Sequence, residues 1–411
     1  MNKNEILKRS ADNVRILVAS MVEKAKSGHP GGAMGGADFI TVLFSEYLRY
    51  DPSDMTWANR DRFFLDPGHM SPMLYSILTL TGSYSIDDIK NFRQWGSVTP
   101  GHPEVDVKRG IENTSGPLGQ GHAMGLGAAI TERFLAARFG EWLEHKTYAF
   151  ISDGGIQEEI SQGVGRLAGH LGLNNLIMFY DSNGIQLSST TGDVTSEDTA
   201  KKYCAWGWNV ITIDGHDFDQ IRSALDNANA EKNRPTLIIG TTIMGKGART
   251  AKGESYESKT ATHGMPLSEA GASFTETVKY LGGNPDDPFV VFSDVKEYFA
   301  GVKEKKIQDA AQRKSVQKAW EKENPALAAK WEQFWSGKLP EIDWEGIEHK
   351  PGIATRAASA DVLSVFAKKI DNMIVSSADL SNSDKTDGFL KNTRILKKGD
   401  FTGAFLQSGV A

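Results

Sequence analysis

The sequence is poor in features that mark several classes of protein. It has one cysteine, Cys204, in 411 residues, which excludes an intrachain disulfide and suits a reducing compartment. It has no apolar run of about 18 residues, so no segment is expected to span a membrane. With 46 basic and 52 acidic side chains, no dominant positive field favours a nucleic-acid partner. The amphipathic N-terminus lacks the apolar core of a signal peptide, and we expect a cytoplasmic protein.

Glycine, in contrast, is abundant. The chain holds 42 glycines, about a tenth of its residues against the usual ~7%. Many of them gather in short turns, which predicts close approaches between backbone and ligand. The length suffices for two or three domains with a large core.

The stretch 148–185 reads YAFISDGGIQEEISQGVGRLAGHLGLNNLIMFYDSNGI. It predicts a strand at 148–151, then a helix, then a second strand at 176–180. Two such strands are nearly always parallel neighbours joined by a right-handed crossover. Asp153 and Asn183 follow them, so both are expected at the carboxyl edge of the sheet, where ligands bind. The helix is expected to bury one face, formed by Ile156, Ile160, Val164, Leu167 and Leu171.

This pair of residues suggests a metal site. A carboxylate and an amide oxygen suit a hard cation such as Mg²⁺ or Ca²⁺. Gly154 and Gly155, at the start of a helix, would let the backbone approach an anion. Taken singly, Asp153 is better explained as a helix cap and Asn183 as a turn former. Together they favour a metal-bridged diphosphate site.

The rest of the chain predicts an α/β fold. Further strands are expected at 63–65, 209–213 and 236–241, separated by helices. This alternation favours one parallel sheet with helices on both faces. Beyond it we expect a polar loop at 245–265, charged helices with tryptophan anchors at about 290–336 and an incomplete second α/β domain with a strand at 373–375.

Histidines recur in the glycine-rich turns. His29, His69, His102, His122 and His216 each follow a glycine, and His263 ends the polar loop. A single histidine more often has a structural role, but several at one sheet edge could shuttle protons and bind anionic oxygen. Zinc is the alternative ligand, and the absence of close His/Cys spacing weakens it.

Six of these turns, in this order, resemble those of the transketolases, which use thiamine diphosphate. The motifs are SGHPGG at 27–32, GHMS at 68–71, TPGHPE at 99–104, GPLGQG at 116–121, SDGG…DSNGI at 152–185 and HGMPL at 263–267. The resemblance covers essentially the whole chain. It implies the thiamine diphosphate-binding fold, with a diphosphate-binding domain at 1–275, a helical linker at 276–345 and the start of a pyrimidine-binding domain at 346–411.

The resemblance also implies roles for individual residues. The divalent metal would be held by Asp153, the Asn183 side chain and the Ile185 carbonyl group. The cofactor would contact His69, Gly116, Leu118, Gly154, Glu158, Asn183, His263 and Asp379, with Glu158 near a subunit interface. Catalysis would use His29, His102 and His263. Sugar phosphate would be bound by His29, His263, Arg356 and Ser383.

The activity implied is transfer of a two-carbon ketol unit from a ketose phosphate to an aldose phosphate, in a homodimer. No residue matches the family's glutamate that activates the cofactor ring. We therefore expect a truncated chain or one half of a split enzyme, weakly active or inactive alone. Alternatives are a deoxyxylulose-phosphate synthase, a dihydroxyacetone synthase and a non-catalytic thiamine diphosphate-binding module; the last is disfavoured by the sugar-phosphate residues.

Overall fold

A computed structural model describes residues 2–410 of the protein. The chain divides into two compact units. The first comprises Met1–Ala129, His145–Gly169 and Asn174–Ala311, and the second comprises Ile130–Glu144, His170–Leu173 and Gln312–Ala411. Each unit is described by itself. No helix among residues 2–410 is long and apolar enough to cross a membrane.

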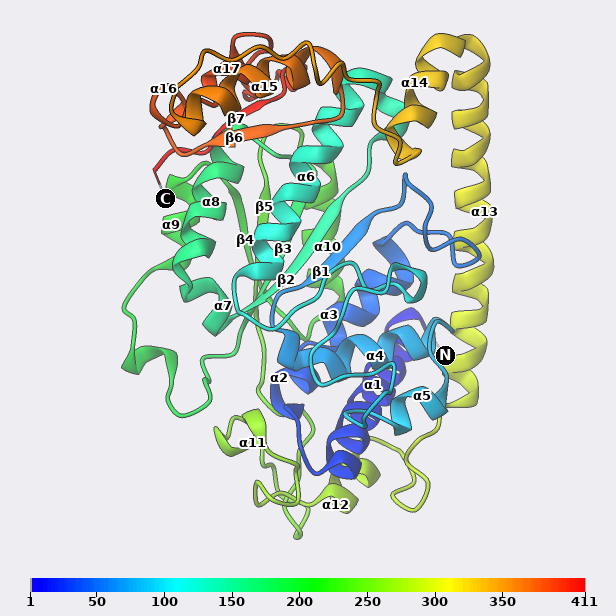
Figure 1. The fold of residues 1–411 in the computed structure, drawn as a ribbon. Helices are drawn as coiled ribbons and strands as arrows, with labels where there is room; N and C mark the ends of the chain where they lie inside the picture. The colour runs from blue at the N-terminus through cyan, green and yellow to red at the C-terminus, as the bar shows by residue number, and fades with distance from the viewer. Residues whose placement is uncertain (1, 411) are drawn as a thin grey trace. The chain divides into compact units, whose positions relative to one another are not determined.

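The first unit is organised on a five-stranded sheet in which every strand pair is parallel (Figure 1). The strand order is β1-β2-β3-β5-β4. All five predicted strands are confirmed, including the pairing of β2 with β3. The strands are β1 (Arg62–Leu65), β2 (Thr147–Ser152), β3 (Leu176–Ser182), β4 (Asn209–Asp214) and β5 (Thr236–Thr241).

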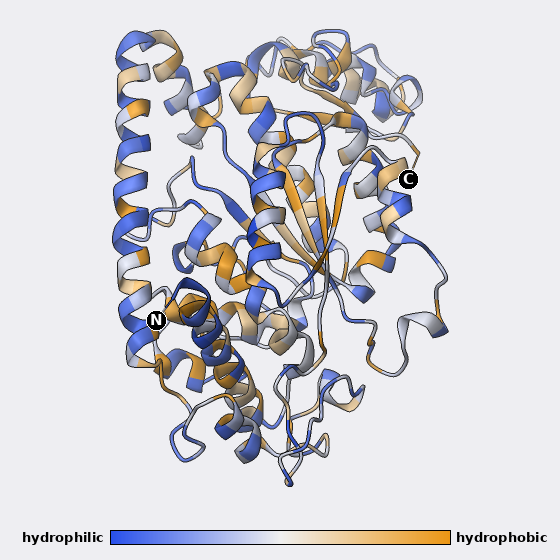
Figure 2. Cartoon of the chain, turned by 180° about the vertical axis from the view of Figure 1, so that it is seen from behind, coloured by the Kyte–Doolittle hydropathy of each residue, from blue (hydrophilic) through white to orange (hydrophobic). Residues whose placement is uncertain are grey.

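Helices cover this sheet, and the strands between them are strongly apolar (Figure 2). Such continuous apolar runs are expected when both faces of a parallel sheet are buried. Phe39 stacks on Phe179 of β3 with ring centroids 3.8 Å apart, so a helix preceding the sheet packs directly on a central strand. The helices that begin in this unit are α1 (Lys3–Ala25), α2 (Pro30–Gly35), α3 (Ala37–Val42), α4 (Ser71–Leu80), α5 (Ile86–Lys90), α6 (Gln120–Phe139), α7 (Asp153–Gln157), α8 (Glu159–Leu171), α9 (Thr199–Ala205), α10 (Phe218–Ala230), α11 (Ala261–Gly264), α12 (Phe274–Tyr280) and α13 (Ser293–Glu323). The last residues of α6, α8 and α13 belong to the second unit.

The second unit contains a small parallel pair of strands and an aromatic cluster. Phe139 lies edge-on to Trp331 and Phe334, with ring centroids 5.1 Å away in both cases. This cluster anchors the charged helices, as their tryptophans suggested. The elements are α14 (Pro325–Trp335), α15 (Thr355–Lys369), β6 (Val375–Ser377), α16 (Ser381–Asp384), α17 (Asp387–Leu390) and β7 (Phe405–Gln407).

The helix predicted after β2 is wrong in one respect. Glu158 has an extended backbone (ψ 137°) and separates α7 from α8. The break changes the helical phase, so Ile160 is 55% exposed instead of sharing a buried face with Ile156. The side chains of Ser161 and Gln162 donate hydrogen bonds to carbonyl groups of α7, at 2.7 and 2.8 Å. These bonds stabilise the break.

The predicted strand at 373–375 is shifted by two residues. The strand is β6, Val375–Ser377, because its partner β7 pairs Val375 with Phe405 and Ser377 with Gln407. Only Val375, the last residue of the apolar run Met373–Val375, therefore lies in the strand. Pairing with a distant segment set the register, and the local sequence does not contain that information.

Candidate functional site

Asp153 and Asn183 meet at the carboxyl edge of the sheet, as predicted from their positions after β2 and β3. Asp153 is only 3% exposed. One carboxylate oxygen accepts hydrogen bonds from the backbone N–H groups of Asn183 (3.2 Å) and Gly184 (2.8 Å). The other accepts one from the Tyr180 hydroxyl group at 2.5 Å. Burial raises the pKa of the Asp153 carboxyl group, and these donors oppose that shift by stabilising the ionised form.

The Asn183 side chain is fixed at both ends. Its Oδ1 accepts a hydrogen bond from the Ile185 backbone N–H and its Nδ2 donates one to Asp181, both at 3.0 Å. Burial raises the pKa of the Asp181 carboxyl group to about 7. The amide orientation therefore directs an oxygen, not a nitrogen, toward the Ile185 side of the turn.

The donor set at this edge is oxygen-rich. Within residues 2–410 no cluster of three or more His, Cys, Asp and Glu side chains could hold a metal ion. The candidate ligands are instead one carboxylate, one amide oxygen and one backbone carbonyl oxygen, from Asp153, Asn183 and Ile185. Such a set fits a hard cation that takes its remaining ligands from phosphate oxygens and water.

Three histidines converge opposite this edge. The ring centroids of His29, His69 and His263 lie 5.1–5.8 Å apart. His29 directly precedes α2, His69 lies in the turn before α4, and His263 lies in α11. The sequence predicted their convergence from three separate turns, and the structure confirms it.

These histidines have unused hydrogen-bonding capacity. The Nδ1 atoms of His29 and His263 are buried and have no hydrogen-bond partner among the described residues. Burial lowers the pKa of all three imidazoles, that of His29 to about 4 with further contributions from His263 and Arg93. The cluster is therefore neutral at pH 7, and an incoming anion could satisfy its N–H groups.

A glycine turn forms another wall of the site. Gly116 and Leu118 lie in the turn before α6, and the Leu118 side chain approaches Gly154 so closely that a Cβ there would be 2.9 Å from it. Asp66, at the end of β1, accepts hydrogen bonds from the backbone N–H groups of Gly119 and His122, both at 3.1 Å. It thereby holds the turn against the sheet.

The three candidate metal ligands and the three histidines line one pocket of about 400 Å³. Its wall includes the predicted His29, His69, His102, Gly116, Leu118, Asp153, Gly154, Asn183, Ile185 and His263. It also includes residues that sequence reasoning missed, namely Gly32, Met70, Ser152, Asp181, Gln186, Leu187 and Met244. Four of them, Gly32, Met70, Ser152 and Asp181, stand within the quoted motifs, whereas Gln186, Leu187 and Met244 stand outside every motif.

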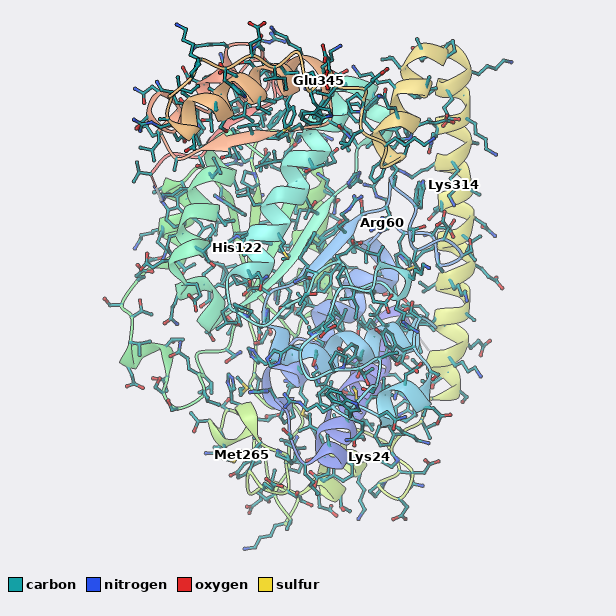
Figure 3. All side chains as sticks on the ribbon, viewed as in Figure 1. Lys24, Arg60, His122, Met265, Lys314 and Glu345 are labelled. Atoms are coloured by element: carbon teal, nitrogen blue, oxygen red, sulfur yellow. The ribbon has the colours of Figure 1, made fainter. Side chains whose placement is uncertain are left out.

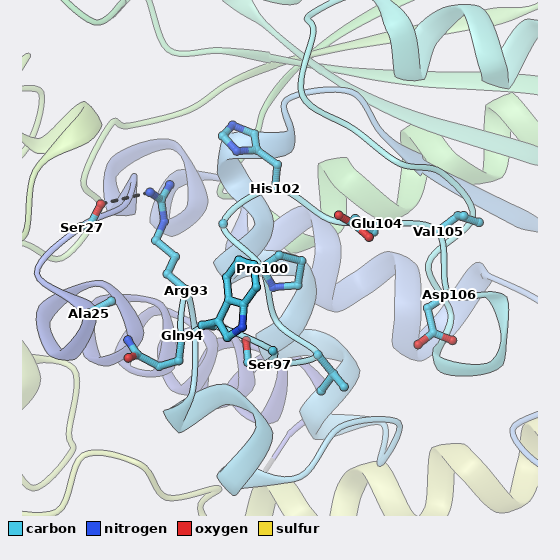
Figure 4. Close-up of a pocket in the computed structure, with 14 residues that line it drawn as sticks. Ala25, Ser27, Arg93, Gln94, Ser97, Pro100, His102, Glu104, Val105 and Asp106 are labelled. Carbon is cyan, nitrogen blue, oxygen red and sulfur yellow. Dashed lines mark hydrogen bonds between the residues drawn. The ribbon is translucent and has the colours of Figure 1, made fainter.

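A wider pocket of about 880 Å³ shares His102 with the first (Figure 4). His102 is exposed, and burial lowers its pKa. Arg93 donates a hydrogen bond to the Ser27 hydroxyl group at 3.0 Å across this pocket. The two pockets therefore meet at His102, which faces the open side.

Four predicted residues lie outside these pocket walls. Glu158 is exposed at the break between α7 and α8. Arg356, Asp379 and Ser383 are exposed residues of the second unit, and Asp379 has a left-handed backbone (φ 64°). Their assignment to a shared site stays a prediction. Figure 3 shows the side chains, with His122 labelled on α6 and Met265 just after α11.

The chain is similar to known proteins over most of its length. The family model "Transketolase, thiamine diphosphate binding domain" matches residues 6–340. A transketolase of Geobacillus stearothermophilus is 40% identical over 383 residues, covering 91% of this chain and 56% of that protein. The structure of transketolase from Leishmania mexicana has a TM-score of 0.92 at 34% identity, covering 98% of this chain and 60% of that one. The complex of Pichia stipitis transketolase with sedoheptulose-7-phosphate has a TM-score of 0.91 at 33% identity, covering 98% and 61%. The chain thus spans 56–61% of the length of these relatives.

Proposed function

The chain belongs to the transketolase family and contains its thiamine diphosphate-binding domain, and on that premise we propose its activity. The chain takes part in ketol transfer between sugar phosphates. It holds the diphosphate end of thiamine diphosphate through a divalent metal ion. The observation that carries this is the pairing of Asp153 and Asn183 opposite the histidine cluster, in one pocket.

Asp153, the Asn183 side chain and the Ile185 carbonyl group are the proposed metal ligands. The buried Asp153 carboxylate already accepts three hydrogen bonds, so it is preorganised for a cation. Mg²⁺ and Ca²⁺ both prefer oxygen ligands of this kind.

The diphosphate would be enclosed by His69, His263 and Gly154. Neutral imidazoles donate one N–H each, and a glycine allows close approach of phosphate oxygens. Gly116 supports this fit, because a Cβ added there would meet no atom within 4 Å. Leu118 offers apolar contact to the organic part of the cofactor.

The cofactor supplies a nucleophilic carbon and an electron sink for carbon–carbon cleavage. The chain supplies proton transfer and hydroxyl binding from His29, His102 and His263. Because the pKa of His29 is lowered to about 4, this imidazole is neutral at pH 7 and able to accept a proton. His102, at the junction with the wider pocket, faces the approach of the substrate.

The sugar phosphate would be bound by Arg356 and Ser383, with Asp379 near the cofactor. An exposed guanidinium suits phosphate because its N–H groups form paired hydrogen bonds. Support comes from the Pichia stipitis enzyme, whose structures were solved with sedoheptulose-7-phosphate and other sugar phosphates. The domain division at residues 275 and 345 belongs to the same proposal.

We propose a homodimer formed through the starts of α6 and α8. Met124 and Ile160 are exposed apolar side chains there, and the small Gly119 lies against Ile160 and the exposed Glu158. An exposed apolar patch around a small residue favours self-association. Light scattering should give a dimer, and Ile160→Asp should shift it toward monomer.

Calorimetric titration with thiamine diphosphate tests the site directly. Binding should require Mg²⁺ and should be lost in Asp153→Ala. Asp309→Ala, on α13 and outside the pocket, is the matched control and should bind normally. Unchanged affinity of Asp153→Ala, or equal binding with EDTA, would refute the metal-bridged site.

A further inference from the structure

His216 makes two strong contacts, although it lines neither pocket. It lies in the turn between β4 and α10. Its Nε2 lies 3.0 Å from the backbone nitrogen of Ile243, and its Nδ1 lies 2.6 Å from an oxygen of Asp38. A backbone N–H only donates, so Nε2 is the acceptor and the imidazole proton sits on Nδ1, where it is donated to Asp38.

Asp38 is itself held from the other side. Its carboxylate pairs with Arg15, which is 3% exposed and also pairs with Asp12. The Arg15 Nε atom donates a further hydrogen bond to the Met34 carbonyl group at 3.0 Å. The buried ion pair fixes the carboxylate, and the carboxylate fixes the tautomer of His216 by accepting its Nδ1 proton in a hydrogen bond.

Ile243 belongs to the segment that leaves β5 and reaches the cofactor pocket. Met244, the next residue, lines that pocket. Thr242, the preceding residue, donates a hydrogen bond from its hydroxyl group to Asp181. The backbone N–H of Gly245 donates one to the Gly31 carbonyl group at 2.9 Å. Thr242, Ile243 and Gly245 are thus each held by a hydrogen bond, and the bond at Ile243 is the one made to an imidazole.

Little space is left around the Met244 side chain and the Ile243 carbonyl group. A Cβ added at Gly31 would lie 2.3 Å from the Met244 sulfur, and one added at Gly35 would lie 3.0 Å from the Ile243 carbonyl oxygen. The segment therefore packs directly on α2, the helix that follows His29. A shift of Ile243 would move both the Met244 wall and the support of His29.

We propose that His216 is a positioning residue, whose Nε2 holds the Ile243 backbone and thereby sets the Met244 wall of the thiamine diphosphate pocket. This inference rests on the proposed function for the identity of the ligand. Its structural part, the anchoring of Ile243, stands without a ligand.

Two substitutions separate the two contacts of His216. The amide of glutamine reaches about as far as Nε2, so His216→Gln retains an acceptor for Ile243. The amide of asparagine reaches about as far as Nδ1, so His216→Asn retains a donor for Asp38 and leaves Ile243 without its acceptor. Asp38 keeps its pairing with Arg15 in both variants.

Affinity for thiamine diphosphate with Mg²⁺ is the first measurement, made by calorimetry on the full 411-residue chain. His216→Asn should bind at least tenfold more weakly, and His216→Gln within about threefold of the parent. A purely structural role would make the two variants equally weak, and equal weakness overturns the proposal. Parent-like binding by His216→Asn overturns it as well.

Amide hydrogen exchange of the peptide 241–247, without ligand, is the second measurement. Exchange at Ile243 should accelerate in His216→Asn and remain near the parent rate in His216→Gln. If the parent chain does not bind thiamine diphosphate, the proposed function fails, and this measurement still decides the anchoring. Equal exchange rates at Ile243 in His216→Asn and His216→Gln would overturn the proposed anchoring, also where both variants keep the parent fold.

Discussion

The hydroxyl group of Tyr180 donates a 2.5 Å hydrogen bond to the carboxylate of Asp153. Tyr180 lies in β3, and Asp153 directly follows β2, the parallel neighbour of β3. The bond joins the third-last residue of β3 to the first residue after β2. Hydrogen bonding to a carboxylate stabilises its charged form. Tyr180 therefore favours the ionised form of a deeply buried acid, the proposed metal ligand, and this is the form that binds a cation.

Replacing Tyr180 with phenylalanine should weaken metal-dependent cofactor binding. Asp153 would lose its side-chain donor, and a hydrogen bond to a charged group contributes ~1.5–3 kcal/mol. We expect about tenfold or greater loss of thiamine diphosphate affinity, measured by calorimetry at fixed Mg²⁺. Tyr203→Phe is the control, because the Tyr203 hydroxyl group has no hydrogen-bond partner among residues 2–410. Equal affinities in the two variants would contradict the role assigned to Tyr180.

Gly116→Ala should impair ligand binding without impairing folding. A Cβ at this position meets no atom within 4 Å and the backbone is not left-handed, so the chain itself accepts the methyl group. The methyl group would instead occupy the pocket that Gly116 lines. We expect an unchanged melting temperature and at least tenfold weaker binding of thiamine diphosphate.

Gly125→Ala is the control for that change. Its added Cβ would make an ordinary 3.6 Å contact with Ala149, and Gly125 does not line the pocket. If both variants bind as tightly as the parent, the cofactor does not approach Gly116.

Gly169→Ala should strongly destabilise the fold. Gly169 lies in α8 against the turn that joins α9 to β4, where an added Cβ would be 1.9 Å from the Trp206 carbonyl oxygen. Backbone cannot yield as a flexible side chain does, so we expect a loss of several kcal/mol. Gly301→Ala, in the open interior of α13, should instead stabilise by ~1 kcal/mol through helix propensity. Urea unfolding midpoints that move in the same direction would contradict this packing argument.

The sequence predicted what depends on order along the chain. Asp153 and Asn183 could be placed together because each follows an apolar strand, and parallel strands end at one edge. Tyr180 could not be assigned, because an apolar strand predicts burial of its side chains and not which one turns toward a neighbour's carboxylate. Ile160 was misplaced because periodicity assumes an unbroken helix. The β6 register depended on β7, about 30 residues away.

Lys306 should make stability depend on pH. The residue is 7% exposed, and its ammonium group donates a 2.6 Å hydrogen bond to the Leu48 carbonyl group. Burial lowers its pKa from 10.5 to about 8, so between these values the unfolded chain binds more protons than the folded chain. Stability contributed by this site should therefore rise with pH from 8 to 10.5 and be lowest, and constant, below pH 8.

Relative to Lys306→Met, the parent should gain on the order of 1–3 kcal/mol over that interval, measured by urea unfolding at pH 7, 8, 9 and 10. Lys305→Met, at an exposed position of the same helix, should run parallel to the parent. The comparison uses the slope because loss of the Leu48 hydrogen bond adds only a constant offset; parallel curves for Lys306→Met would show that the buried ammonium group is not destabilised.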